Sequence, residues 1–104
     1  MDIVSLREYC ISKDDVTESL PFGDDTLVFK KGDKIFALVN LEGELNLNLK
    51  CDPGYAMELR ERYQAVIPGY HMNKKHWNTV IIDGSIPDNE IFSWIDHSYL
   101  IVTG

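Results

Sequence analysis

Cysteine is scarce in this sequence, and long apolar runs are missing from it. The two cysteines, Cys10 and Cys51, form no C-x-x-C motif. Buried thiols explain them better than a disulfide or a metal site, because free cysteine is among the most often buried residues. No window approaches the ~18 apolar residues of a membrane helix. Residues 1–8 contain early acids and no apolar core, which excludes a signal peptide and predicts a cytoplasmic protein that contacts no membrane.

The common catalytic and nucleotide-binding motifs are also missing. The sequence contains no G-x-x-x-x-G-K-[ST], no G-x-G-x-x-G and no G-x-S-x-G. Asp96, His97 and Ser98 have the residue types of a catalytic triad, but they are consecutive. Consecutive helical side chains point about 100° apart, so they cannot meet at one substrate atom. These absences favour a non-enzymatic protein and predict no cofactor.

Size and charge limit the remaining possibilities. At 104 residues, with 44% hydrophobic residues, the chain has the size of one globular domain over residues 1–104. The net charge of −7 comes from 17 acidic and 10 basic residues. A charge of this sign argues against broad, nonspecific binding of a phosphate backbone, which needs an extended positive surface.

One internal segment departs from this acidic character. From Arg62 to Ile82 there is no Asp or Glu, and Arg62, Lys74 and Lys75 give the segment a charge of +3. The rest of the chain, with 7 basic and 17 acidic residues, carries −10. If the protein binds an anion, this segment is the first place to expect it.

Residue patterns predict an α+β domain with a mostly antiparallel, four-stranded sheet and helices packed on one face. The predicted order is α-β-β-β-α-β-α, and the acidic residues 14–25 are expected to be mainly a connection. The helices are predicted at residues 2–13, at residues 53–64 and from residue 88, and the strands at residues 26–30, 34–41, 45–50 and 79–83. Asp2 and Asp52 are the expected N-caps of the first two helices.

Strict alternation makes the third strand the clearest of the four. Leu45, Leu47 and Leu49 share one face, and the residues between them are polar. Such a period of two is typical of a half-buried antiparallel strand. The opposite face, with Asn46, Asn48 and Lys50, is therefore expected to be partly solvated.

The run from Pro68 to Thr79 has neither helical nor strand periodicity. Its polar groups are suited to phosphate, carboxylate or a nucleic-acid backbone. Two aromatic residues, Tyr70 and Trp77, offer rings that could stack on a base. A role in the core is favoured for both, because a small domain has few other large residues. The polar residues in question are His71, Asn73, Lys74, Lys75 and His76.

Metal binding and acid–base chemistry are two further roles to consider for the histidines of this run. His71 and His76 do not have the spacing of metal ligands, so no metal is predicted. Lys50, Asp52 and His71 could serve acid–base chemistry if they converged. The role of Asp52 as a helix cap is the simpler explanation.

Several segments resemble the MmcQ/YjbR family of small bacterial proteins, in the family's order and over nearly the whole chain. The matching segments are residues 21–23, 34–38, 47–53, 68–79 and 96–99. The resemblance implies a compact α+β domain with an antiparallel sheet, likened to a CyaY-like arrangement. It also implies a largely unassigned function, for which DNA binding through a double-wing shape has been suggested. Family members often continue past the position of Gly104, commonly with basic residues. The candidate residues carried over are Lys50, His71, Asn73, Lys74, His76, Trp77 and Asn78.

Our leading hypothesis from the sequence is a non-enzymatic binding protein that contacts DNA through residues 70–78 and the polar strand face near Lys50. The alternatives are a small anion or a protein partner bound at the same place, and an enzyme with His71 or His76 as acid–base. The candidate site residues are Lys50, His71, Asn73, Lys74, Lys75, His76, Trp77 and Asn78. The sequence leaves the ligand, the oligomeric state and the cellular process open.

Overall fold

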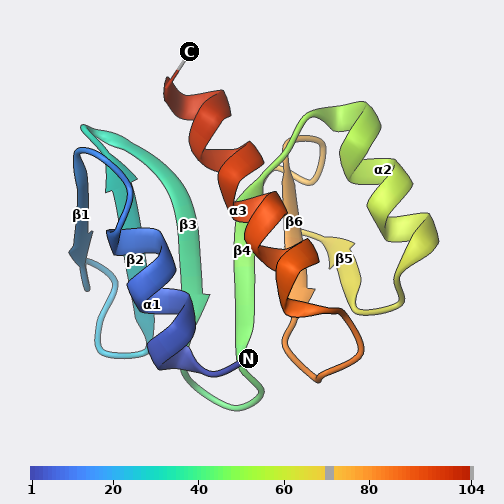
Figure 1. Cartoon of the computed structure of the whole chain (residues 1–104), viewed down its shortest axis with the longest axis horizontal. Helices are drawn as coiled ribbons and strands as arrows, with labels where there is room; N and C mark the ends of the chain where they lie inside the picture. Colours follow the sequence, from blue (N-terminus) through green and yellow to red (C-terminus); the bar gives the residue numbers. More distant parts are fainter. Residues whose placement is uncertain (70–71, 104) are drawn as a thin grey trace.

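The computed structural model describes residues 1–69 and 72–103, which form one sheet and three helices (Figure 1). The helices are α1 (Ile3–Ile11), α2 (Pro53–Arg62) and α3 (Asp88–Thr103). The strands are β1 (Val16–Ser19), β2 (Thr26–Lys31), β3 (Lys34–Asn40), β4 (Asn46–Lys50), β5 (Val66–Pro68) and β6 (Trp77–Ile81). No helix among the described residues is long and apolar enough to cross a membrane.

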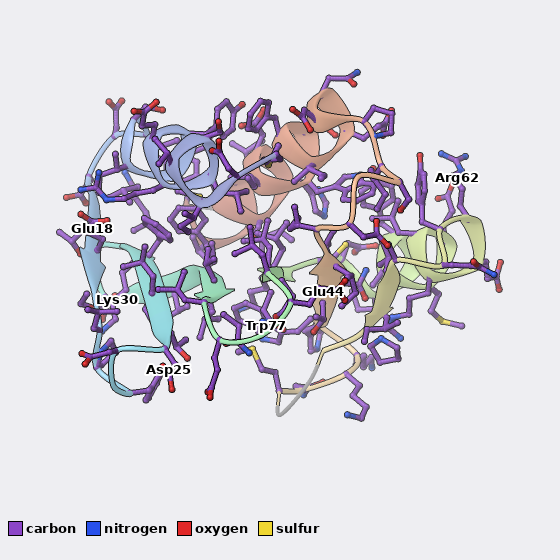
Figure 2. All side chains as sticks on the ribbon, turned by 90° about the horizontal axis from the view of Figure 1, so that it is seen from below. Glu18, Asp25, Lys30, Glu44, Arg62 and Trp77 are labelled. Carbon is purple, nitrogen blue, oxygen red and sulfur yellow. The ribbon has the colours of Figure 1, made fainter. Side chains whose placement is uncertain are left out.

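All neighbouring strands are antiparallel, in the order β1-β2-β3-β4-β6-β5. Helices α1 and α3 lie on one face of this sheet, and α2 lies beside the edge formed by β5 and β6 (Figure 1). Seen along the strands, no helix covers the opposite face within the described part of the chain (Figure 2). We call this second face the open face. The predicted fold class, with helices on one face of an antiparallel sheet, is confirmed.

The number of strands is a correction, because the sheet has six strands rather than four. The first missed strand, β1, lies in the segment predicted to be a connection, and the second, β5, has only three residues. Both are edge strands that pair with a single neighbour, β2 and β6 respectively. Segments this short are too small to show a period of two, so tertiary pairing rather than local pattern makes them strands.

The boundaries of β6 also change the interpretation of the run from Pro68 to Thr79. The strand begins at Trp77, two residues before its predicted start, so Trp77 and Asn78 are part of the sheet. The two helix caps are as predicted. The side chain of Asp2 accepts a hydrogen bond from the Ser5 amide, and that of Asp52 accepts one from the Tyr55 amide.

The main hydrophobic core fills the space between the sheet and the helices. Leu47 and Leu49 of β4 are 0% and 2% exposed there, which confirms the predicted alternation. Cys10 and Cys51 are both buried and unbridged, as expected. Burial raises the pKa of the Cys10 thiol to about 12 and that of the Cys51 thiol to about 11, so both stay protonated near neutral pH.

A β-bulge at Phe36 determines how β3 meets its neighbours. Phe29 pairs with Ala37 and Lys30 with Ile35, so Phe36 has no partner on β2. On its other side β3 pairs with β4 only as far as Ala37 and Leu49, and the fully buried Ser98 of α3 bridges the two strands beyond that pair. Its hydroxyl donates to the Phe36 carbonyl at 2.6 Å and accepts from the Lys50 amide at 3.0 Å. One α3 side chain therefore fixes the end of β4 where Lys50 lies.

Candidate functional site

Strand register arranges the open face in three rows that run across the sheet, because paired residues on neighbouring antiparallel strands point to the same side. The amide row contains Thr26, Asn40, Asn46 and Ile81. The middle row contains Val28, Leu38, Asn48, Thr79 and Ile67. The lysine row contains Lys30, Ile35, Lys50 and Trp77. Along the strands the face thus changes from a mainly neutral polar row, through a mixed row of apolar and neutral polar side chains, to a row that carries two lysines.

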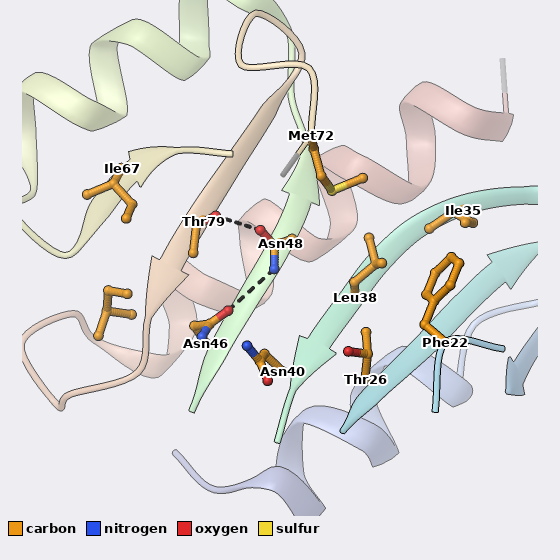
Figure 3. A pocket seen from close by; sticks show the side chains of 11 residues that line it. Phe22, Thr26, Ile35, Leu38, Asn40, Asn46, Asn48, Ile67, Met72 and Thr79 are labelled. Atoms are coloured by element: carbon orange, nitrogen blue, oxygen red, sulfur yellow. Dashed lines mark hydrogen bonds between the residues drawn. The ribbon is translucent and has the colours of Figure 1, made fainter. Parts of the chain in front are cut away.

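A pocket of about 600 Å³ occupies the open face over the amide and middle rows (Figure 3). Phe22, from the β1–β2 connection, and Met72, from the connection before β6, project beside it from outside the sheet. Among the described residues that line it, none carries a charge. The lining consists of Phe22, Thr26, Ile35, Leu38, Asn40, Asn46, Asn48, Ile67, Met72, Thr79 and Ile81.

A chain of side-chain hydrogen bonds crosses the pocket floor. The Thr79 hydroxyl donates to the Asn48 amide oxygen at 2.5 Å, and the Asn48 amide nitrogen donates to Asn46 at 3.4 Å. Asn46 in turn donates to the Glu44 carbonyl at 3.2 Å. On β3, the Asn40 side-chain oxygen accepts from the Glu42 amide at 3.1 Å. These bonds fix the orientation of all three carboxamides.

The connection before β6 is held by its own turn and by α2. The Asn73 side chain accepts from the Lys75 amide at 2.9 Å, and the Lys74 ammonium donates to the Gly69 carbonyl at 3.3 Å. Arg60 of α2 donates to the carbonyl oxygens of Lys74 and Trp77. Arg60 therefore anchors this connection to the helix.

Trp77 packs against the open face rather than in the main core. It is 9% exposed and forms a second hydrophobic cluster with Val28 and Leu38, against which Met72 packs. Gly69 makes this packing possible, because a Cβ there would lie 2.7 Å from the Trp77 Cβ. The predicted packing role of Trp77 is confirmed, but the cluster it builds is separate from the main core. Figure 2 labels Trp77 on the side of the sheet opposite the helices.

The structure separates the predicted site residues into different environments. Lys50 is half-buried on the open face, whereas Asn73, Lys74 and Lys75 are exposed on the connection before β6. His76 is half-buried, and its carbonyl accepts from the Cys51 amide at 2.7 Å. His71 and Tyr70 lie outside the described residues.

Asn78 faces away from this group. It is 2% exposed, pairs with Leu49 and so points toward the helices. Its amide oxygen accepts from Arg60 at 2.7 Å, and its nitrogen donates to the Ala56 carbonyl at 3.3 Å. Its position between α2 and the sheet gives Asn78 a structural contact and leaves it no exposure on the open face.

Asn40 and Thr26 were not predicted as site residues from the sequence. Neither residue lies in the acid-free segment from Arg62 to Ile82. Asn40 is the last residue of β3 and Thr26 the first residue of β2, and the strand pairing puts both in register with Asn46. Only the register reveals this alignment.

The triad-like Asp96, His97 and Ser98 point in three directions, as predicted. Asp96 accepts from Tyr9 at 2.7 Å and pairs with Lys13, which ties α1 to α3. His97 accepts from the Asp52 amide through Nε2 at 3.2 Å. Within residues 1–69 and 72–103, no three His, Cys, Asp or Glu side chains gather where they could hold a metal ion.

Charged residues are segregated at the two ends of the open face. Lys30 lies one residue before the end of β2, and Lys50 ends β4 at the same side, next to the connection that carries Lys75. Exposed acids lie in the connections at the other end, next to the amide row. These acids are Asp24, Asp25, Glu42 and Glu44. The pocket therefore lies between an acidic and a basic end.

Comparisons with known proteins agree on one family. A family model described as YjbR matches residues 11–101. The chain is 37% identical to an uncharacterised protein YjbR of Escherichia coli K12 over 95% of its own length and 85% of that protein. It is 42% identical to an uncharacterised protein YbdF of Escherichia coli O157:H7, covering 81% of this chain and 70% of that one.

Solved structures give the same result for the fold. Protein DR2400 of Deinococcus radiodurans superposes with a TM-score of 0.92 at 41% identity, covering 97% of this chain and 78% of that one. A crystal structure of a Pseudomonas syringae protein superposes with a TM-score of 0.85 at 29% identity, covering 97% and 98% of the two chains.

Proposed function

The chain belongs to the YjbR family of small bacterial proteins, and we propose that it is a non-enzymatic protein that binds a small ligand in the pocket of the open face. The observation that carries this proposal is the pocket itself. Its volume of about 600 Å³ is within the range of small-molecule sites, which run from roughly 300 to 1,000 Å³. Apolar walls around a few convergent polar groups are also typical of such sites.

Binding is favoured over catalysis by the chemistry of the walls. Six of the eleven lining residues are apolar, and the other five are asparagines and threonines. Among these described residues, none is an acid, a histidine or a cysteine that could exchange a proton or attack a substrate near neutral pH. Fixed carboxamides in apolar surroundings are suited to recognition by hydrogen bonds.

The experiment that tests this function fills the pocket and leaves the rest of the open face unchanged. Thr26→Trp places a large side chain inside the pocket, whereas Thr17→Trp, on the neighbouring strand β1, lies on the same face outside it. A library of small fragments is screened by saturation-transfer NMR against both variants and the parent. We expect fragments that bind the parent and Thr17→Trp but not Thr26→Trp. If no fragment shows this pattern, the pocket is not a binding site.

DNA binding is a second candidate, favoured by the lysines at one end of the open face. Lys50 and Lys75 have no side-chain partner among the described residues, so both ammonium groups are available to phosphates. Binding of this kind weakens steeply with salt. We expect Lys50→Ala combined with Lys75→Ala to weaken duplex binding, whereas Lys34→Ala, on the helix-covered face, leaves it nearly unchanged. Absence of duplex binding at low salt would reject this candidate.

A further inference from the structure

We infer that the ligand of the open-face pocket is an elongated organic anion that lies along β4 in one orientation. A neutral carbonyl oxygen of the ligand meets the amide row, its apolar body covers Leu38, and its anionic group lies at Lys50. This inference rests on the proposed function and adds to it the class of the ligand and the direction in which it binds.

The amide row and the adjacent Asn48 of the middle row select a hydrogen-bond acceptor. The side-chain oxygens of Asn40, Asn46 and Asn48 each already accept a hydrogen bond from the protein. Their nitrogens are used less completely, because each carboxamide has two N–H donors. Asn46 and Asn48 donate one bond each, and Asn40 donates none to a described residue. Four N–H groups on these three side chains therefore remain for ligand oxygens.

The acceptor at this end is neutral rather than ionised. Asp24, Asp25, Glu42 and Glu44 are exposed in the two connections that border the amide row. Their negative charges repel a carboxylate or phosphate placed beside them. A ketone, amide or ester carbonyl accepts the same hydrogen bonds without that repulsion.

The middle of the pocket selects an apolar body. Leu38 forms the floor of the middle row, while Ile67 approaches from β5 and Met72 from the connection before β6 (Figure 3). Ile67 is 36% exposed, and Phe22 at the rim is 68% exposed, so a ligand would cover apolar surface that water now contacts. This burial is the main source of affinity expected at the site.

The opposite end selects an anion. Lys50 follows Asn48 on the same face of β4, and Lys30 occupies the same row on β2. Both are half-buried, and neither ammonium has an acidic partner among the described residues. From Asn46 to Lys50 the strand advances by four residues, about 13 Å. The carbonyl and the anionic group of the ligand are separated by a somewhat shorter chain, because the long side chain of Lys50 can reach back along the strand.

The test uses three probes that differ only at their ends: the monoamide of octanedioic acid, octanediamide and octanoate. The monoamide has the neutral carbonyl and the anion, octanediamide has no anion, and octanoate has no amide. Each is titrated into the ¹⁵N-labelled full chain and followed by NMR. We expect the monoamide to bind tightest and to shift the side-chain amide signals of Asn40, Asn46 and Asn48.

Two substitutions test the orientation. Lys50→Met keeps the apolar stem of the side chain and removes its charge, and Asn40→Asp replaces N–H donors with an acceptor. We expect Lys50→Met to weaken binding of the monoamide about five-fold and to leave the affinity for octanediamide unchanged. Asn40→Asp should weaken binding of the monoamide to a similar extent and leave the affinity for octanoate unchanged. Lys34→Met, on the other face, is the control for loss of a positive charge.

The outcomes separate this inference from the proposed function. If fragments bind in the pocket but the three probes bind equally, or if Lys50→Met weakens octanediamide as much as the monoamide, the inferred ligand class is wrong and the pocket remains a binding site. If binding of the monoamide's carboxylate depends on Asn40 rather than on Lys50, the ligand lies in the opposite orientation and the inference is overturned. If nothing binds the pocket, both proposals fall together.

Discussion

Ser98→Ala is expected to destabilise the protein far more than its small change in volume suggests. The Ser98 side chain is fully buried, and its hydroxyl joins the Phe36 carbonyl of β3 to the Lys50 amide of β4. The pairing of β3 with β4 ends at Ala37 and Leu49, so the hydroxyl takes the place of the strand partner that the next pair of a regular ladder would supply. Alanine removes both hydrogen bonds and gives neither group a replacement.

The magnitude follows from the two backbone groups left unpaired. A buried donor or acceptor without a partner costs about 1 to 3 kcal/mol. Alanine recovers about 0.5 kcal/mol through its higher helix propensity. We therefore expect the free energy of unfolding to fall by about 2 to 5 kcal/mol, a large part of the roughly 5 to 15 kcal/mol that a domain has.

Urea denaturation of Ser98→Ala beside Ser93→Ala measures this effect. Ser93 lies in the same helix, is exposed, and donates only to the Glu90 carbonyl, so it shares the gain in helix propensity without the buried bonds. The free energy of unfolding of Ser93→Ala should stay within about 0.5 kcal/mol of that of the parent. A difference between the two variants below about 1 kcal/mol, at equal m-values, would show that the hydroxyl is not needed to satisfy the two backbone groups.

Three further predictions concern the framework of the site. Gly69→Ala should cost about 1 to 3 kcal/mol, because its Cβ would lie 2.9 Å from a backbone oxygen of the neighbouring tryptophan, whereas Gly54→Ala in α2 should be neutral or stabilising in thermal unfolding. Arg60→Gln should speed amide hydrogen exchange in residues 73–77 while that of β2 stays slow; equal exchange in both segments would contradict the anchoring role. Because burial raises the pKa values of Cys10 and Cys51 to about 12 and about 11, neither thiol should react with Ellman's reagent at pH 8 before unfolding; fast labelling of the native protein would refute this.

Local signals in the sequence predicted the elements whose evidence lies within a few residues. The caps Asp2 and Asp52 bind the amides three residues ahead, so the residue type and its position are sufficient. The alternation of leucine and asparagine in β4 similarly identified its buried and solvated faces. The edge strands β1 and β5 lack such a signal, since they become strands only by pairing with β2 and β6.

The candidate site was only partly accessible to the same reasoning. The acid-free segment drew attention to Lys74 and Lys75, which are exposed. The same segment includes Asn78, whose buried side chain forms hydrogen bonds with α2. Adjacent residues of a strand point to opposite faces, and composition does not show which face a given residue takes. The pocket lies beside this segment, and β2 and β3 supply part of its lining.

The sequence by itself determined the family, the α+β class, the helix caps, the buried cysteines and the two faces of β4, since each depends on residue type or short-range spacing. Only the tertiary structure decided the six-stranded order, the rows of the open face and the pocket between its acidic and basic ends. These depend on register, which aligns Thr26, Asn40 and Asn46 although other strands and turns separate them along the chain. Side chains that neighbour one another only across strands leave no periodic trace in the sequence, and the site of this protein is built from such neighbours.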